Sequence, residues 1–127
     1  MDLAEENLIQ HFDDTYDFIH NTYENNGKIL VHCEAGVSRS VSVMAAYLMR
    51  SLKITPKAAL DIIRDHRVFA QPNDGFMDQL ELYHTLQYDV DPKHAAYRRF
   101  LVVGMAKEQQ GDYAPQWLFE KLIFWCL

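Results

Sequence analysis

Cys33 and Arg39 are separated by five residues, within the segment Cys-Glu-Ala-Gly-Val-Ser-Arg-Ser at positions 33–40. An ionised thiol can attack phosphorus, and a guanidinium can hold two phosphate oxygens in its planar fork. Gly36 permits a close approach of the backbone to an anion, so that the N–H groups of the segment can surround it. The segment therefore predicts a phosphate site beside a cysteine nucleophile.

The same groups predict the chemistry of the sulfur. We expect the loop amides, Arg39 and a following helix to lower the pKa of the Cys33 thiol from about 8.5 towards the ~3.5–7.5 of activated cysteines. The thiolate would form a cysteinyl-phosphate, Ser40 would donate a hydrogen bond to the departing sulfur, and His32 would order the loop from behind. The residues predicted to bind the phosphate are Glu34, Ala35, Gly36, Val37, Ser38 and Arg39.

Such a loop needs a strand before it and a helix after it, and the sequence supplies both. Residues 28–32 form a short apolar run rich in branched side chains, which is typical of a buried strand. Residues 41–52 are apolar almost all round, as a central helix is. Upstream, apolar residues at steps of three and four predict an amphipathic helix over 5–23, ended by Asn-Asn-Gly at 25–27. Its predicted inner face consists of Leu8, Phe12, Tyr16, Ile19 and Tyr23.

Three further helices are predicted downstream. Thr55 and Pro56 are a typical N-cap and first residue for a helix that runs to about residue 65. Asn73 or Asp74 caps the next helix, and we expect Gln79 on the surface of that helix. Its predicted inner face contains Phe76, Leu80, Tyr83 and either Leu86 or Gln87. The third helix is predicted over 94–107.

The pattern contains one strand only, and a lone strand leaves its backbone groups unpaired on both edges. We therefore expect that related proteins have strands before Met1 that are absent here. The apolar tail at 116–127 either docks on the body of the protein or stays exposed. The predicted fold is an incomplete α/β domain, mostly helical, with a central active-site strand and few or no partner strands.

Composition and charge exclude several classes of protein. A chain of 127 residues with 49% hydrophobic and 24% charged residues has the composition of one globular domain. A net charge of −6 provides no general attraction for nucleic acid or an anionic membrane. The sequence contains no apolar stretch of membrane-spanning length, its acidic N-terminus is unlike a secretory signal, and its His and Cys residues lack metal-ligand spacing. We expect no metal, no cofactor, and a cytoplasmic or nuclear location.

The chemistry-bearing segment resembles the His-Cys-five-residues-Arg signature of the cysteine phosphatases, and the wider chain resembles the dual-specificity group of that superfamily over residues 2–90. The motifs that carry the likeness are Ile29-Leu30-Val31-His32-Cys33, Ala35-Gly36-Val37-Ser38-Arg39-Ser40, Ala46-Tyr47-Leu48-Met49 and Pro72-Asn73-x-Gly75-Phe76-x-x-Gln79-Leu80. The resemblance implies the cysteine-phosphatase fold, with the C-terminal part of the catalytic domain over 1–90 and a helical extension with an apolar tail over 91–127. It also implies a monomer that hydrolyses phosphotyrosine and phosphoserine or phosphothreonine in protein substrates.

The resemblance further implies a general acid, an aspartate roughly thirty residues before the cysteine and a few residues before an Asn-Leu pair. Asp2 lies 31 positions before Cys33, and Asn7-Leu8 follows it. Asp2 is therefore expected to protonate the leaving group. The alternative for Asp2 is an ordinary charge near the chain terminus.

The segment after residue 87 resembles one branch of the group, whose full-length members are linked to ribosome assembly and append a zinc-binding domain. The likeness rests on Tyr88-Asp89-Val90-Asp91, Ala96-Tyr97-Arg98 and Leu101, and the sequence contains no cysteine-rich segment of the zinc-binding kind. A phosphate-binding module with little turnover remains an alternative function. The absence of lysine from the loop disfavours phosphoinositides, and the Arg39-Ser40 ending disfavours a sulfur-transfer enzyme.

Overall fold

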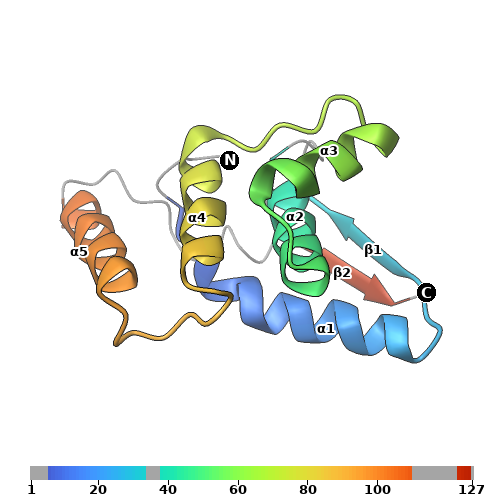
Figure 1. Ribbon diagram of the computed structural model, residues 1–127, viewed down its shortest axis with the longest axis horizontal. Helices are drawn as coiled ribbons and strands as arrows, with labels where there is room; N and C mark the ends of the chain where they lie inside the picture. The colour runs from blue at the N-terminus through green and yellow to red at the C-terminus, as the bar shows by residue number, and fades with distance from the viewer. Residues whose placement is uncertain (1–5, 34–37, 110–122, 127) are drawn as a thin grey trace.

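A computed structural model of the chain describes the backbone of residues 6–33, 38–109 and 123–126, and the side chains of the first two ranges as far as residue 103. The elements in chain order are η1 (Ile9–His11), α1 (Phe12–Glu24), β1 (Ile29–His32), α2 (Arg39–Leu52), α3 (Pro56–His66), α4 (Asp74–Thr85), α5 (Ala95–Gln109) and β2 (Ile123–Cys126). Figure 1 shows α2 in the middle, with α1, α3, α4 and β1 around it and α5 beyond α4. The predicted mostly helical architecture with an active-site strand is confirmed.

The helix α2 occupies the centre because it offers apolar side chains on nearly all sides. Its buried apolar residues are Val41, Val43, Ala45, Ala46 and Met49. The alanines let neighbouring helices approach closely, and α2 packs against α1, α3, α4 and β1. The helix begins at Arg39, two residues before the predicted start, because the Ser42 amide already donates to the carbonyl of Ser38 at 2.8 Å.

The helix predicted over 5–23 is shorter than expected. A 3-10 turn at Ile9–His11 precedes α1, because the amides of Leu8 and Ile9 donate to the side chain of Gln79 on α4. The predicted inner face is correct for Leu8, Phe12 and Ile19, which are buried, but wrong for Tyr23, which is 71% exposed in the last turn. The helix ends as predicted, with Asn26 at a φ of 57° and the Gly27 amide donating to the Thr22 carbonyl.

The starts of α3 and α4 are held by side-chain caps. The Thr55 hydroxyl accepts a hydrogen bond from the Ala58 amide at 3.2 Å, as predicted for α3. Asn73 Oδ1 accepts from the Phe76 amide at 2.8 Å, so the cap of α4 is Asn73. Asp74 is instead the first residue of the helix, where its negative charge interacts favourably with the positive end of the helix dipole.

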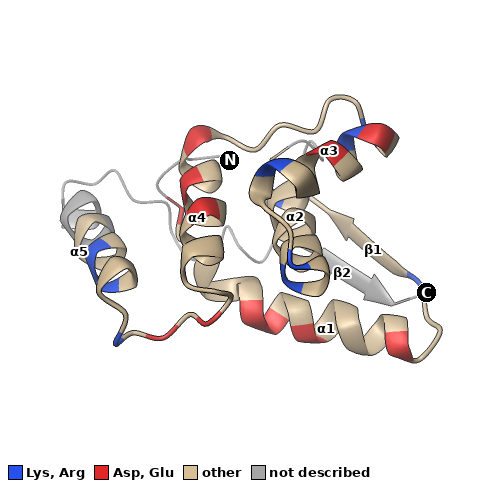
Figure 2. Ribbon diagram, in the orientation of Figure 1, with Lys and Arg blue, Asp and Glu red and all other residues tan. Residues whose placement is uncertain are grey.

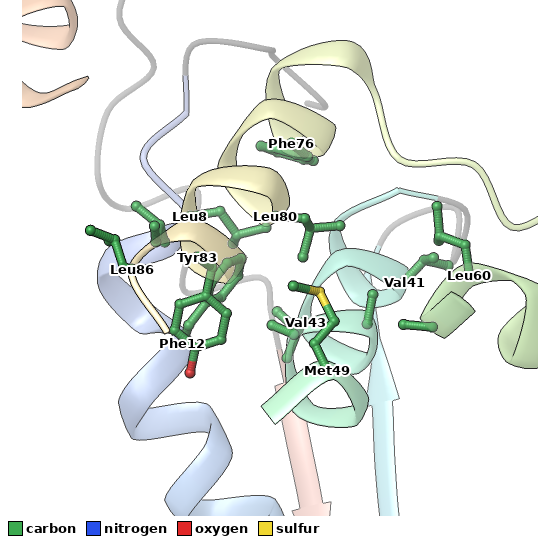
Figure 3. Packing of buried hydrophobic residues seen from close by; sticks show 14 of the residues in the cluster. Leu8, Phe12, Val41, Val43, Met49, Leu60, Phe76, Leu80, Tyr83 and Leu86 are labelled. Atoms are coloured by element: carbon green, nitrogen blue, oxygen red, sulfur yellow. The ribbon is translucent and has the colours of Figure 1, made fainter. Parts of the chain in front are cut away.

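The main core lies between α1, α2 and α4. The rings of Phe12 and Tyr83 meet edge to face with their centroids 5.0 Å apart. Figure 3 shows both rings beside α4, with Met49 and Val43 of α2 near them. A polar contact also joins α2 to α1, because Arg50 Nη1 lies 3.2 Å from Asp13 Oδ1.

The sheet consists, among the described residues, of β1 and β2. They pair antiparallel, in the register Ile29↔Cys126, Leu30↔Trp125, Val31↔Phe124 and His32↔Ile123. Of the two alternatives for the apolar tail, its last segment therefore docks, as a strand on β1. The prediction of a fully buried strand is wrong, because Leu30 is 47% exposed while Ile29 and Val31 pack on the core.

The charges of the protein are unevenly distributed. Figure 2 shows Asp and Glu without Lys or Arg on α1 and α4, Lys and Arg on α2 and α5, and residues of both signs on α3. No helix of the described part of the chain combines the length and the apolar character needed to cross a bilayer.

Candidate active site

Cys33 follows the last residue of β1, and Ser40 lies in the first turn of α2. Cys33 Sγ and Ser40 Oγ are 3.4 Å apart, within hydrogen-bonding distance for sulfur. The thiol can donate to this hydroxyl, and the hydroxyl can donate to a thiolate. The sulfur thus lies beside the N-terminus of a helix of 14 residues, where the helix dipole favours negative charge.

Arg39 is the first residue of α2 and is 2% exposed, while Cys33 is 8% exposed. A guanidinium buried to this degree acts in a low local dielectric, where its attraction for an anion is stronger than in water. The structure therefore brings Cys33, Arg39 and Ser40 to the junction between β1 and α2. This junction is where the sequence predicted them.

Ser38 connects this junction to α4. Its hydroxyl accepts a hydrogen bond from the backbone N–H of Asn73 at 2.9 Å, and its carbonyl accepts one from the Ser42 hydroxyl at 2.7 Å. Ser38 therefore makes no side-chain cap to α2 and instead joins the end of the active-site loop to the start of α4. The contact with Asn73 is not visible in the sequence, because 35 residues separate Ser38 from Asn73.

Several predicted site residues lie outside the described part of the chain. They are Glu34, Ala35, Gly36 and Val37 of the loop, and the candidate acid Asp2. Their roles stay predictions.

His32 lies at the end of β1, next to a groove of about 390 Å³ between β1, α2 and α3. The groove is lined mainly by apolar side chains, with His32, Ser40, His66 and Arg67 as its polar members. Because Ser40 also contacts Cys33 Sγ, the groove adjoins the site at the junction of β1 and α2. No described group of three or more His, Cys, Asp and Glu residues lies close enough to hold a metal.

Gln79 was predicted on the surface of α4, and this prediction is wrong. The side chain is 1% exposed and reaches back to the start of the chain, where it contacts the backbone of Glu6, Leu8 and Ile9. The apolar spacing of α4 did not reveal this, because a polar residue on a helix is ordinarily assigned to solvent. The available sequence signal is its spacing, three residues after Phe76 and four before Tyr83, because residues three and four apart share a helix face.

Comparison with known proteins identifies the family of this chain. A family model described as the catalytic domain of dual specificity phosphatases matches residues 1–85. The chain belongs to this family. The predicted resemblance to dual-specificity phosphatases and the predicted fold class are thereby confirmed.

Relatives from several eukaryotes share the similarity. The chain is 39% identical over 100 residues to dual specificity protein phosphatase 12 of Mus musculus, covering 79% of this chain and 30% of the relative. It is 36% identical over 113 residues to tyrosine-protein phosphatase yvh1 of Schizosaccharomyces pombe, covering 89% of this chain and 33% of that relative. It is 46% identical over 76 residues to human dual specificity protein phosphatase 5, covering 60% of this chain and 20% of that relative. The chain spans about a third or less of the length of these dual specificity phosphatase relatives.

Proposed function

We propose that this dual specificity phosphatase chain hydrolyses phosphomonoesters on protein side chains through a cysteinyl-phosphate intermediate. Cys33 attacks the phosphorus, Arg39 and the loop amides hold the non-bridging oxygens, and Asp2 protonates the leaving oxygen. Ser40 stabilises the sulfur when water releases the phosphate. The reaction uses the charge of Arg39 and the helix N-terminus, so it needs no cofactor.

The observation that carries this proposal is the contact between Cys33 Sγ and Ser40 Oγ at 3.4 Å, at the first turn of α2 and next to the buried Arg39. A structural cysteine is ordinarily surrounded by apolar groups, which raise its pKa. Here a hydroxyl donor and a helix N-terminus favour the ionised sulfur. Membership in the dual specificity phosphatase family supports the same chemistry.

The proposed substrates are phosphotyrosine and phosphoserine or phosphothreonine in proteins, and the relatives named dual specificity protein phosphatases support this breadth. We also infer that the chain acts as a monomer in the cytoplasm or nucleus, where a reducing environment preserves the thiolate.

The test compares the purified chain with its Cys33→Ser variant on an aryl phosphate and on phosphotyrosine and phosphothreonine peptides. We expect turnover by the wild type and none above the buffer rate for Cys33→Ser, because the hydroxyl is not ionised at neutral pH. The matched control is Cys126→Ser, which removes the other cysteine and should retain activity. Ser40→Ala should slow release of phosphate and give a rapid initial burst of phenol.

A phosphate-binding module without turnover predicts a different pattern. Wild type and Cys33→Ser would then both bind a phosphotyrosine peptide, and neither would release inorganic phosphate. That result would refute the enzymatic proposal.

A further inference from the structure

The groove of about 390 Å³ between β1, α2 and α3 runs along one edge of β1. Its lining includes Leu30, Val31 and His32, which are consecutive in the strand. Consecutive side chains of a strand point to opposite faces, so a groove that touches all three follows the edge of the strand. Figure 1 shows β1 between β2 and α3. Because α3 also lines the groove, the edge concerned is the one opposite β2.

This second edge of β1 can take up another strand. Among the described residues no strand pairs with it, since the sheet there consists of β1 and β2. The backbone N–H and C=O groups of an open edge bind an extended segment of another chain, and neighbouring pockets accept its alternate side chains. The groove provides apolar contacts for such side chains from Met44 and Leu48 of α2 and from Ile62 and Ile63 of α3.

One end of the groove adjoins the proposed nucleophile. β1 ends next to Cys33 and α2 begins near it, so His32 and Ser40 mark this end. Ser40 Oγ lies 3.4 Å from Cys33 Sγ. Leu48, which also lines the groove, follows Ser40 by eight positions, which corresponds to about 12 Å along the axis of α2. The groove therefore leads away from the site over a distance that about four extended residues span.

The charges of the lining suit a phosphorylated chain. None of the described residues that line the groove is Asp or Glu, although the whole chain has a net charge of −6. Arg67 contributes a positive charge to the lining. A segment that carries a phosphate dianion therefore meets no like charge in the groove.

We propose that the groove binds the part of a protein substrate that flanks the phosphorylated residue, as an extended strand on the open edge of β1. The inference rests on the proposed function, because it places the phosphorylated residue at Cys33. The substrate chain must continue from that residue, and the groove begins there, at Ser40. The preferred substrates therefore carry apolar side chains at alternate positions within about four residues of the phosphorylated one.

The first test compares two phosphotyrosine peptides of equal length and charge on the wild-type chain. One peptide carries leucine or valine at the second and fourth positions on both sides of the phosphotyrosine, and the other carries serine there. We expect kcat/KM to be roughly 10-fold higher for the apolar peptide, mainly through a lower KM, because apolar side chains that leave water favour binding.

The second test asks whether the peptide pairs with β1 as a strand. Alternate N–H groups of an added strand point towards the strand that it joins. Methylation of single backbone nitrogens in the apolar peptide should therefore lower kcat/KM several-fold at every second position and have little effect at the positions between them.

Variants of the chain locate the effect in the groove. Leu30→Thr and Ile62→Gln change lining residues that are 47% and 39% exposed, so a polar side chain is tolerated there. Each should lower the ratio of kcat/KM for the apolar peptide to kcat/KM for an aryl phosphate by about 3–10-fold. The matched control is Leu52→Gln at the end of α2, which changes a side chain that is 55% exposed and should keep the wild-type ratio. The peptide comparisons use the wild type and stay decisive if a variant does not fold.

Several results would overturn the inference. They are equal kcat/KM for the two peptides, methylation effects without alternation, and the same ratio of rates in the groove variants as in the Leu52→Gln control. A concentration-dependent dimer that Leu30→Thr dissociates would also overturn it, because a second copy of the chain would then occupy the edge. Failure of the proposed function has a different signature, since the wild type would then show no Cys33-dependent hydrolysis of the aryl phosphate itself, and the inference would fall with it.

Discussion

Tyr83 illustrates how one buried residue links three helices. Its ring packs against Phe12, and its hydroxyl donates to Asp13 Oδ1 at 3.5 Å, close to the Arg50 guanidinium. Burial raises the pKa of Tyr83 from 10.0 to about 12, because desolvation disfavours the phenolate. The stability that this phenol contributes is complete below pH 10 and is lost as the pH rises through 12.

At the residue scale we therefore predict that the free energy of unfolding falls at alkaline pH in a manner that depends on Tyr83. Between pH 9 and pH 11 this residue should account for a decrease of about 1.4 kcal/mol. Tyr83→Phe should remove that decrease, as measured by urea unfolding at both pH values. Tyr23→Phe, at a position 71% exposed, is the matched control and should keep the wild-type slope. An unchanged slope in Tyr83→Phe would contradict the prediction.

At the scale of elements, α4 differs from α3 although their N-caps are chemically alike. Thr55 caps α3 at a distance from the proposed site. The side chain of Asn73 caps α4, and its backbone N–H also donates a hydrogen bond to the hydroxyl of Ser38. The helix end at Asn73 is therefore part of the support of the active-site loop. The hydrogen bond at Thr55 joins two residues at the start of α3 itself.

We predict that Asn73→Ala and Thr55→Ala each lower the free energy of unfolding by about 1 kcal/mol, since each removes a cap. Only Asn73→Ala should also lower kcat/KM for an aryl phosphate, by several-fold, because fraying of α4 displaces Ser38. Urea unfolding and steady-state kinetics on the same samples measure both effects. Equal activity of the two variants would show that the start of α4 does not support the loop.

At the scale of the whole molecule, the strand that leads to Cys33 is stabilised from a distant part of the chain. β2 lies about ninety positions after β1 and pairs with it along its whole length of four residues. Pairing satisfies backbone groups that a lone strand would leave to water, and it covers an edge that could otherwise recruit another chain. The C-terminal strand thus supports the placement of the nucleophile.

A chain ending at Gln109 should therefore be less stable and more prone to associate. We expect a lower urea midpoint and a peak of larger size in size-exclusion chromatography at micromolar concentration, both absent from the full chain. A truncated chain with an unchanged midpoint and elution volume would show that the β1–β2 pair contributes nothing to stability.

The position of the proposed site and the order of the helices could be predicted from the sequence. The spacing of Cys33 and Arg39, the branched run before them and the apolar helix after them predicted the β1–loop–α2 junction, because these signals act over a few neighbouring residues. The caps at Thr55 and Asn73 are local in the same way, since a side chain bonds an amide three positions ahead.

The partners of α4 and of β1 could not be predicted from the sequence and became known from the packed structure. The contacts of Gln79 with residues 6–9, of Asn73 with Ser38 and of β1 with β2 join positions 35 to more than 90 residues apart. Periodicity reports which face of an element is apolar, but it does not report which distant backbone groups need a hydrogen-bond partner. For that reason the sequence pattern predicts an exposed Gln79 and a buried Leu30, whereas the structure buries Gln79 and leaves Leu30 about half exposed.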